Sequence, residues 1–245
     1  MTIKDFIRKT LNYLHLDITK NLEYDRLTKA IMKRLLKKDS CCIDIGCHKG
    51  EILDDMVKRS PKGKHYAFEP IPVFFENLKG KYKNKPNIKL YPYALSEQEK
   101  KSSFNFVKNA PAYSGIKKRR YDIENPEIEE IEVEQNLLDN IISKEKKIDF
   151  VKIDVEGAEF GVLKGGKDLL KQQKPTILFE CGLGGSDYYG TTAEGIYGFI
   201  TEEIGLEIYT LKKFLSNSKA LTTKEFKQLF DTNKEYYFVA HNNKR

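Results

Sequence analysis

The sequence predicts an α/β domain of the Rossmann-like type, in which helices cover both faces of a mostly parallel sheet. Three observations support this fold class. A short apolar run at residues 41–45 is broken by Gly46 and Gly50 and leads into a helical pattern, as when a buried parallel strand turns tightly into a helix. Strand-like and helix-like segments then alternate along the chain. Two later strand-like segments end in Asp154 and Glu180, at the sheet edge where open α/β folds bind ligands.

Length and composition agree with one globular unit. A chain of 245 residues, 40% hydrophobic and 32% charged, suits a single domain with additions. We expect an N-terminal helical cap over residues 1–39 and one domain over residues 40–245. There is no apolar run near the roughly 18 residues of a membrane span and no signal-peptide pattern, so a cytoplasmic protein is expected. The four cysteines are predicted to be buried thiols, not disulfides or zinc ligands.

The formal net charge is +7, and residues 1–40 hold ten Lys/Arg against five Asp/Glu. We interpret this mainly as a solvated basic face. An anionic substrate or a membrane-surface contact is the alternative interpretation. Basic residues elsewhere are matched by acids, and no RNA-binding aromatic motif is present, so no nucleic-acid partner is expected.

Two helices are predicted before the first strand. The first covers residues 3–16 and is amphipathic, and the second covers residues 22–37. We expect them to cap the domain or one side of a substrate cleft, with a membrane-surface role for the first as the minor alternative.

The glycine turn is the predicted cofactor site. Its glycines, Gly46 and Gly50, do not have the G-x-G-x-x-G spacing of dinucleotide-binding turns, and Asp44 precedes them. A carboxylate there would repel a pyrophosphate but could hold the ammonium of S-adenosylmethionine. The alternative is an ordinary glycine-containing turn between a strand and a helix.

Further cofactor contacts are predicted after the next strands. Residues 64–69 form a strand that ends in Glu69, which could accept two ribose hydroxyl protons, and Pro70 follows it. A helix at 73–82 leads to a strand at 88–91. The run at residues 93–96, with Ala94 and Leu95, should border the adenine.

The middle of the chain is predicted to form a substrate-side lid. A short strand at 102–107 precedes an irregular stretch, residues 110–126, that holds Ser114, Gly115 and the basic run 117–120. Such long loops in compact domains are usually functional or mobile. Residues 124–134 alternate as an exposed edge strand would.

The strand at residues 148–155 most resembles a catalytic one. It carries Lys152 and Asp154, and Glu156 follows at its exit. A helix over residues 160–170 is predicted next, and the strand at 176–179 ends in Glu180. Unpaired buried charges are costly, so these residues form either a paired structural network or an active site. The glycine-rich loop at 182–192 has Asp187 and Tyr188 as candidate substrate contacts, with a plain connection as the alternative. Helices at 193–203 and 223–230 and strands at 206–210 and 236–241 are predicted to complete the domain.

Five motifs together resemble the FkbM-type S-adenosylmethionine-dependent methyltransferases. They are I-D-I-G-x-x-x-G from residue 43, Y-A-F-E-P at 66–70, Y-A-L-S at 93–96, F-V-K-I-D-V-E-G-A-E at 150–159 and I-L-F-E at 177–180. The resemblance implies the class I methyltransferase fold, a three-layer sandwich around a seven-stranded sheet in the order 3-2-1-4-5-7-6 with an antiparallel last strand. It also implies O-methylation of a sugar or other hydroxyl-bearing small molecule. At residues 47–49 the chain departs from the Ala-Asn common in this turn.

The candidate residues have distinct expected roles. Asp154 is the first choice for general base, with Glu156 and Glu180 as partners, Lys152 as an orienting group and His48 as a competing base. A divalent cation such as Mg²⁺ could be held by Asp154 and Glu180. The acceptor is expected to be a small molecule, for instance a nucleotide-linked sugar, and a homodimer is compatible with the sequence. Two alternatives stay open: a nicotinamide-dependent oxidoreductase and a non-catalytic binding module.

Overall fold

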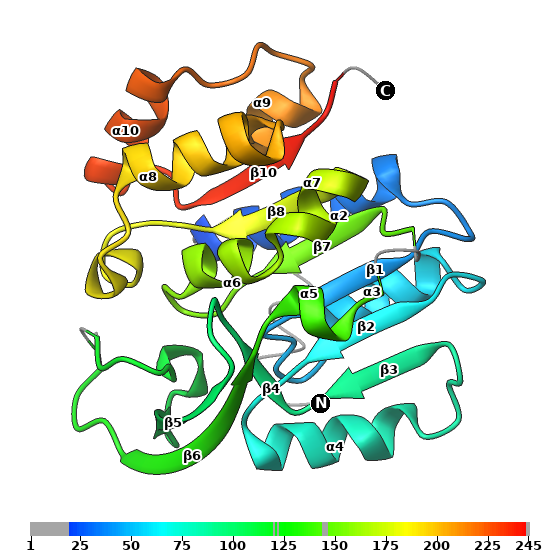
Figure 1. The fold of residues 1–245 in the computed structure, drawn as a ribbon, viewed down its shortest axis with the longest axis vertical. Helices are drawn as coiled ribbons and strands as arrows, with labels where there is room; N and C mark the ends of the chain where they lie inside the picture. Colours follow the sequence, from blue (N-terminus) through cyan, green and yellow to red (C-terminus); the bar gives the residue numbers. More distant parts are fainter. Residues whose placement is uncertain (1–19, 120, 122, 144–146, 244–245) are drawn as a thin grey trace.

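The computed structural model describes residues 20–119, 121, 123–143 and 147–243, which form a sheet covered by helices on both faces (Figure 1). The seven strands of the large sheet have the spatial order β3-β2-β1-β7-β8-β10-β9. Numbered within this sheet along the chain, the order is 3-2-1-4-5-7-6, and β10 runs antiparallel to both of its neighbours. The predicted fold class is therefore confirmed. The strands are β1 (Cys42–Ile45), β2 (His65–Phe68), β3 (Ile88–Tyr91), β7 (Phe150–Ile153), β8 (Thr176–Glu180), β9 (Glu207–Thr210) and β10 (Tyr237–His241).

The two helical layers form because the central strands are apolar on both faces, as parallel strands in α/β proteins must be. On one face, α2, α3 and α9 pack on side chains such as Cys42, Phe150 and Leu178, with α4 beside α3. On the other, the remaining helices pack on Ile43, Val151 and their neighbours. The helices are α2 (Lys20–Leu35), α3 (Glu51–Arg59), α4 (Pro72–Tyr82), α5 (Leu138–Ile141), α6 (Glu159–Gly165), α7 (Lys167–Gln173), α8 (Ala193–Gly198), α9 (Leu211–Leu215) and α10 (Thr223–Asp231).

A second, three-stranded sheet was not predicted. It has the order β4-β6-β5, built from β4 (Tyr93–Leu95), β5 (Lys100–Val107) and β6 (Ile128–Asn136). The expectation of an exposed edge strand at residues 124–134 was wrong, because β6 is the central strand and pairs with both neighbours. Its alternation has another cause: Val133 faces an apolar cluster with Phe74 and Phe104, while the glutamates face solvent. In Figure 1, β5 and β6 lie at lower left, apart from the large sheet.

Two predicted helices differ in detail. The helix after β7 is divided into α6 and α7 at Gly165 and Gly166. Gly165 packs directly on the main chain, since a Cβ there would lie 1.9 Å from the Ser96 carbonyl oxygen. The helix expected at 193–203 is α8 followed by a wider π-helical turn, η3 (Phe199–Ile204). These changes leave the layer arrangement as predicted.

At the N-terminal end, the predicted second helix is present as α2, whereas the helix predicted at residues 3–16 lies outside the described residues. The division into a cap of residues 1–39 and a domain of residues 40–245 stays a prediction. Within the described part of the chain, no helix has the length and apolarity needed to cross a bilayer. All four cysteines are free thiols; Cys42, Cys47 and Cys181 are buried and Cys41 is half-buried.

Candidate functional site

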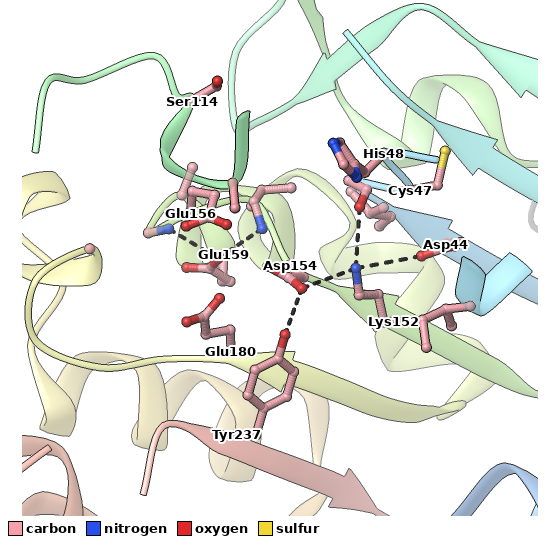
Figure 2. Close-up of a pocket in the computed structure, with 18 of the residues that line it drawn as sticks. Asp44, Cys47, His48, Ser114, Lys152, Asp154, Glu156, Glu159, Glu180 and Tyr237 are labelled. Atoms are coloured by element: carbon pink, nitrogen blue, oxygen red, sulfur yellow. Dashed lines mark hydrogen bonds and ion pairs between the residues drawn. The ribbon is translucent and has the colours of Figure 1, made fainter. Parts of the chain in front are cut away.

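A cavity of about 1090 Å³ lies at the carboxyl ends of β1, β2, β7 and β8 (Figure 2). Its lining also includes residues of α2, of the second sheet and of two loops. We call residues 110–119 the bridging loop and residues 182–190 the glycine-rich loop. Most of the predicted site residues line this cavity: Asp44, Gly46, His48, Glu69, Pro70, Ala94, Leu95, Ser114, Lys152, Asp154, Glu156 and Glu180.

Lys152 lies on β7 at the cavity floor, and its side chain links β7 to the neighbouring strand β1. Its ammonium lies 3.2 Å from an Asp154 oxygen and 3.8 Å from an Asp44 oxygen, and it donates to the Gly46 carbonyl at 3.2 Å. Lys152 and Asp44 are both buried. Burial alone would lower the pKa of Lys152, but the charges of Asp154 and Asp44 outweigh it and raise this pKa. Lys152 is therefore a permanent cation that neutralises part of the acidic site.

Asp154 is ionised because its partners oppose the effect of burial. Burial would raise its pKa, but the charge of Lys152 and hydrogen bonds to its carboxylate lower it. One of these bonds comes from Tyr237 on β10, whose hydroxyl donates to Asp154 at 2.5 Å. No sequence pattern singles out Tyr237, which lies 83 residues from Asp154 in the chain.

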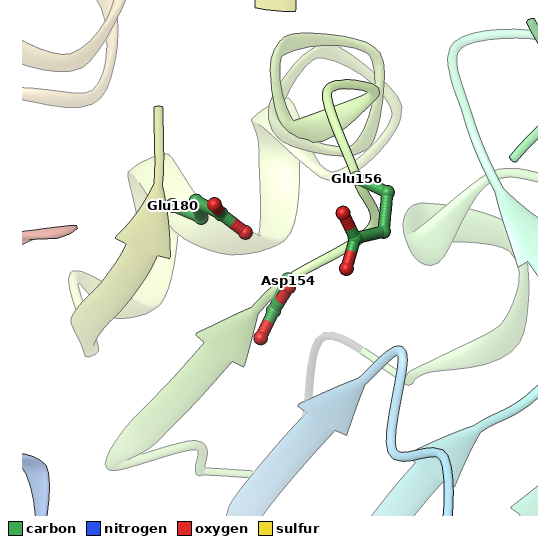
Figure 3. A group of neighbouring side chains, drawn as sticks. All are labelled: Asp154, Glu156 and Glu180. Carbon is green, nitrogen blue, oxygen red and sulfur yellow. The ribbon is translucent and has the colours of Figure 1, made fainter. Parts of the chain in front are cut away.

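Three glutamates surround Asp154. One oxygen each of Asp154, Glu156 and Glu180 lie within 4.8 Å of one another (Figure 3). Burial and the charge of Asp154 raise the pKa of Glu156 to about 8, and the same two effects raise that of Glu180 well above its usual range. Burial also raises the pKa of Glu159 to about 7. The cluster thus combines one ionised aspartate with glutamates whose pKa values are raised to near neutral pH or above it.

Glu159 holds the turn that presents Glu156. Its buried carboxylate accepts hydrogen bonds from the main-chain N–H groups of Val155 and Gly157 at 3.0 and 3.1 Å (Figure 2). Glu156 has a φ of 59°, in the left-handed region that non-glycine residues rarely occupy. Backbone outliers of this kind concentrate at functional sites. The E-G-A-E motif contained Glu159, but nothing in the sequence separated its role from that of Glu156.

On the side of the cavity formed by the glycine turn, Glu69 holds two main-chain segments in place. Its two oxygens accept hydrogen bonds from the N–H groups of His48 at 2.8 Å and Ile71 at 2.9 Å, and burial raises its pKa to about 7. Gly46 has a φ of 74°, and a Cβ there would lie 1.9 Å from the Asp154 carbonyl oxygen, so only glycine fits. Gly50 caps α3 and does not line the cavity.

His48, the competing candidate for the base, is half-buried at the glycine turn. Its ring packs edge-on against Phe74 at 4.3 Å between centroids, and burial lowers its pKa, which keeps the imidazole neutral. Among the described residues, its Nε2 atom has no hydrogen-bond partner. The same holds for both carboxylate oxygens of Asp44.

The predicted substrate contacts need correction. Asp187 and Tyr188 are exposed and do not line the cavity, whereas Ser186 and Tyr189 do. These four residues form the 3₁₀ turn η2 (Ser186–Tyr189), in which residues three apart share a face. In the bridging loop, the Ser114 hydroxyl lines the cavity but accepts a hydrogen bond from the Val107 N–H. Gly115 forms main-chain hydrogen bonds with Asn105 and is absent from the lining.

The two loops meet over the cavity. The Lys117 N–H donates to the Tyr189 hydroxyl oxygen at 3.0 Å, and the Lys117 ammonium donates to the Tyr188 carbonyl at 3.2 Å. Arg119, in the same bridging loop, forms an ion pair with Glu156 at 2.7 Å. The basic run at 117–120 was predicted to belong to the substrate-side lid. Among its described residues, Arg119 lines the cavity; Arg120 lies outside the described residues.

Comparisons with known proteins give concordant results. A family model described as the methyltransferase FkbM domain matches residues 44–220. A 2-O-methyltransferase, NoeI of Sinorhizobium fredii, is 25% identical over 166 residues, which are 61% of this chain and 66% of NoeI. The crystal structure of a methyltransferase FkbM from Methylobacillus flagellatus superposes with a TM-score of 0.53 at 11% identity, covering 97% of this chain and 59% of that one. The chain thus spans less than two thirds of the length of either protein.

Proposed function

The chain belongs to the FkbM methyltransferase family, and we propose that it is an S-adenosylmethionine-dependent O-methyltransferase acting on a sugar or another hydroxyl-bearing small molecule. The observation that carries this proposal is the shared cavity. Residues suited to the cofactor, on β1 and β2, face residues suited to accepting a proton, on β7 and β8, across one space.

The cavity residues fit the cofactor. Asp44 offers buried carboxylate oxygens without a hydrogen-bond partner among the described residues, and Gly46 leaves bare backbone beside them. Glu69 stands at the end of β2, where a carboxylate can accept from ribose hydroxyls. Pro70, Ala94 and Leu95 supply an apolar border for the adenine. When bound, S-adenosylmethionine supplies a methyl group that its sulfonium makes electrophilic.

The protein must then orient the acceptor hydroxyl and remove its proton. We assign the proton-accepting role to Glu156, because a general base works best with a pKa near the working pH and that of Glu156 is raised to about 8. Asp154 stays in the site as a fixed anion, held by Lys152 and Tyr237. Glu180 keeps its proton beside Asp154 and shares a hydrogen bond with that carboxylate. His48, which is neutral and has a free Nε2 atom among the described residues, is the second candidate base.

The proposed mechanism places protein cations beside the carboxylates. Asp154, Glu156 and Glu180 are close enough together to hold a metal ion. Two of these three acids already have a cationic partner, because Lys152 pairs with Asp154 and Arg119 pairs with Glu156. The divalent cation expected at Asp154 and Glu180 is not needed for this charge balance.

The charge of the cavity supports an uncharged acceptor. Ten Asp/Glu and four Lys/Arg line it, although the whole chain carries a net charge of +7. Without the four glutamates of raised pKa, Glu69, Glu156, Glu159 and Glu180, six acids still face four bases. An acidic cleft disfavours anionic ligands, so the excess of lysine and arginine on the chain does not support a nucleotide-linked sugar. The 2-O-methyltransferase activity in the name of NoeI supports a hydroxyl as the methylated group.

The decisive experiment compares cofactors and then acceptors. Isothermal titration with S-adenosylhomocysteine should show binding, and titration with NAD⁺ should not. A panel of neutral sugars and sugar nucleotides, incubated with a labelled methyl donor, would identify the acceptor. Binding of NAD⁺ alone would favour the oxidoreductase alternative, and binding of neither would favour a non-catalytic module.

A further inference from the structure

The bridging loop is attached to the rest of the protein at two separate places. At its base, Gly115 forms two main-chain hydrogen bonds with Asn105 of β5, and the Asn105 side chain donates to the Ile116 carbonyl. Beyond the base, Lys117 contacts the glycine-rich loop, and Arg119 contacts Glu156 in the turn after β7. The base is part of a sheet, whereas the distal attachment depends on side chains.

Arg119 is the member of the loop that touches the proposed base. Its side chain is 13% exposed and that of Glu156 is 20% exposed, so the 2.7 Å ion pair is shielded from most of the solvent. Tyr113 lies under the guanidinium at 5.0 Å, which fixes its orientation from within the same loop. Ion pairs shielded in this way are screened by salt much less than exposed pairs.

The turn that carries Glu156 cannot easily follow a moving loop. Gly157 packs on Gly185 so closely that a Cβ on Gly157 would lie 2.4 Å from the Gly185 carbonyl carbon. The Glu159 carboxylate also accepts hydrogen bonds from two main-chain N–H groups of the same turn. The Glu156 side of the ion pair is held by its own turn, whereas the bridging loop beyond residue 116 is attached through contacts of Lys117 and Arg119. The Arg119–Glu156 pair therefore works as a latch on the loop.

We propose that Arg119 is a positioning residue, whose ion pair with Glu156 holds the bridging loop over the cavity and fixes the Glu156 carboxylate toward the acceptor. This inference rests on the proposed function, because it takes Glu156 to be the proton acceptor. The charged groups that face Glu156 are Asp154, Glu159 and Glu180, which favour its protonated form, and Arg119 and Lys152, which favour its ionised form. Arg119 belongs to the loop, so this one ion pair joins the loop to the turn that carries Glu156.

Hydrogen exchange of the ligand-free full-length chain tests the latch. Arg119→Gln should speed exchange of the amides at 116–119 about threefold or more, since local opening governs their exchange. Glu156→Gln should have the same effect, and the double variant should exchange no faster than either single one. Lys118→Gln is the matched control, because Lys118 is exposed in the same loop and its loss also removes one positive charge. It should exchange as the wild type does.

Carbon-13 NMR of the glutamate carboxyl groups tests the effect on Glu156, whose signal is identified by its loss in Glu156→Gln. The titration midpoint of Glu156 should move to higher pH in Arg119→Gln and return toward the wild-type value in Arg119→Lys. The proposal is overturned if Arg119→Gln exchanges like Lys118→Gln, if the effects of the two single substitutions multiply in the double variant, or if the midpoint does not move. None of these measurements needs a cofactor, so failure to bind S-adenosylhomocysteine would refute the proposed function and leave the latch to be judged separately.

Discussion

Lys152 is the residue on which the charge balance of the site depends. It lies between Asp44 and Asp154, each on a different strand, and also donates to the Gly46 carbonyl of the glycine turn. One ammonium therefore joins the proposed cofactor side of the cavity to the proposed catalytic side. Breaking a buried ion pair by removing one partner leaves an uncompensated charge, which is far more costly than losing a surface pair.

We predict that Lys152→Met lowers the free energy of unfolding by about 3–5 kcal/mol, because Asp44 and Asp154 lose their buried counterion. Urea denaturation at pH 7 measures this. Lys167→Met is the matched control, since the Lys167–Glu203 pair is exposed on the surface, and it should change stability little. If the two variants are equally stable, Lys152 is not the counterion described here.

Glu69 makes stability depend on pH in a defined direction. Burial raises its pKa from 4.5 to about 7, so the folded protein holds this proton over a range in which the unfolded chain has lost it. Stability should therefore fall as the pH rises from about 4.5 to 7. We predict that the fall in the free energy of unfolding between pH 5 and pH 8 becomes smaller in Glu69→Gln, measured by urea denaturation at each pH. If the free energy of unfolding of Glu69→Gln falls as much between pH 5 and pH 8 as that of the wild type, the pKa of Glu69 is not raised in the folded protein.

At the scale of elements, the short turn after β7 sets the geometry of the site. Gly157 has a φ of 107° and packs on the main chain of the glycine-rich loop. This contact places the exits of β7 and β8 against each other, and the acids at these exits meet as a consequence. A side chain at residue 157 would separate them.

We predict that Gly157→Ala weakens S-adenosylhomocysteine binding and lowers the melting temperature more than Gly190→Ala does. Both glycines have a positive φ, at 107° and 72°, so both substitutions introduce backbone strain. Only at Gly157 would the added Cβ also collide with another main chain, since nothing lies within 4 Å of a Cβ on Gly190. Calorimetry and thermal denaturation measure both variants, and equal losses of binding and stability would contradict this prediction.

At the scale of the whole molecule, charge is distributed unevenly. The chain is basic overall, yet its cavity is lined by more than twice as many acids as bases. The net charge of the chain therefore does not describe the charge of the cavity. An acceptor that enters the cavity experiences the electrostatic potential of these nearby acids. Salt screens this potential, with a Debye length of roughly 10 Å at 0.1 M.

We predict that a neutral sugar is methylated with a higher kcat/KM than its phosphorylated counterpart, and that the difference narrows as the salt concentration rises from about 25 to 300 mM, because salt screens the repulsion. Methyl transfer to matched pairs of sugars at several NaCl concentrations measures this. A preference for the phosphorylated sugar, weakened by added salt, would reverse the conclusion.

Much of the fold could be predicted from local patterns. The strand from Cys42 to Ile45 and the strand from Phe150 to Ile153 are buried throughout, and such strands are recognisable as short apolar runs between turns. The second sheet escaped prediction because its strands alternate, and alternation reports which face is exposed without indicating the neighbouring strands. The position of β6 between β4 and β5 depends on pairing between distant segments.

The sequence by itself determined the chemistry available at the carboxyl edge of the sheet: Asp44, Glu69, Asp154 and Glu180 each follow from the strand they lie on or end, and the parallel sheet brings these strand ends together. The tertiary structure alone decided which groups are paired and which remain available. Tyr237 on Asp154, Arg119 on Glu156 and the inward turn of Tyr189 join residues far apart in the chain. Local periodicity specifies the face on which a side chain lies, but contacts between distant segments arise only when the layers pack.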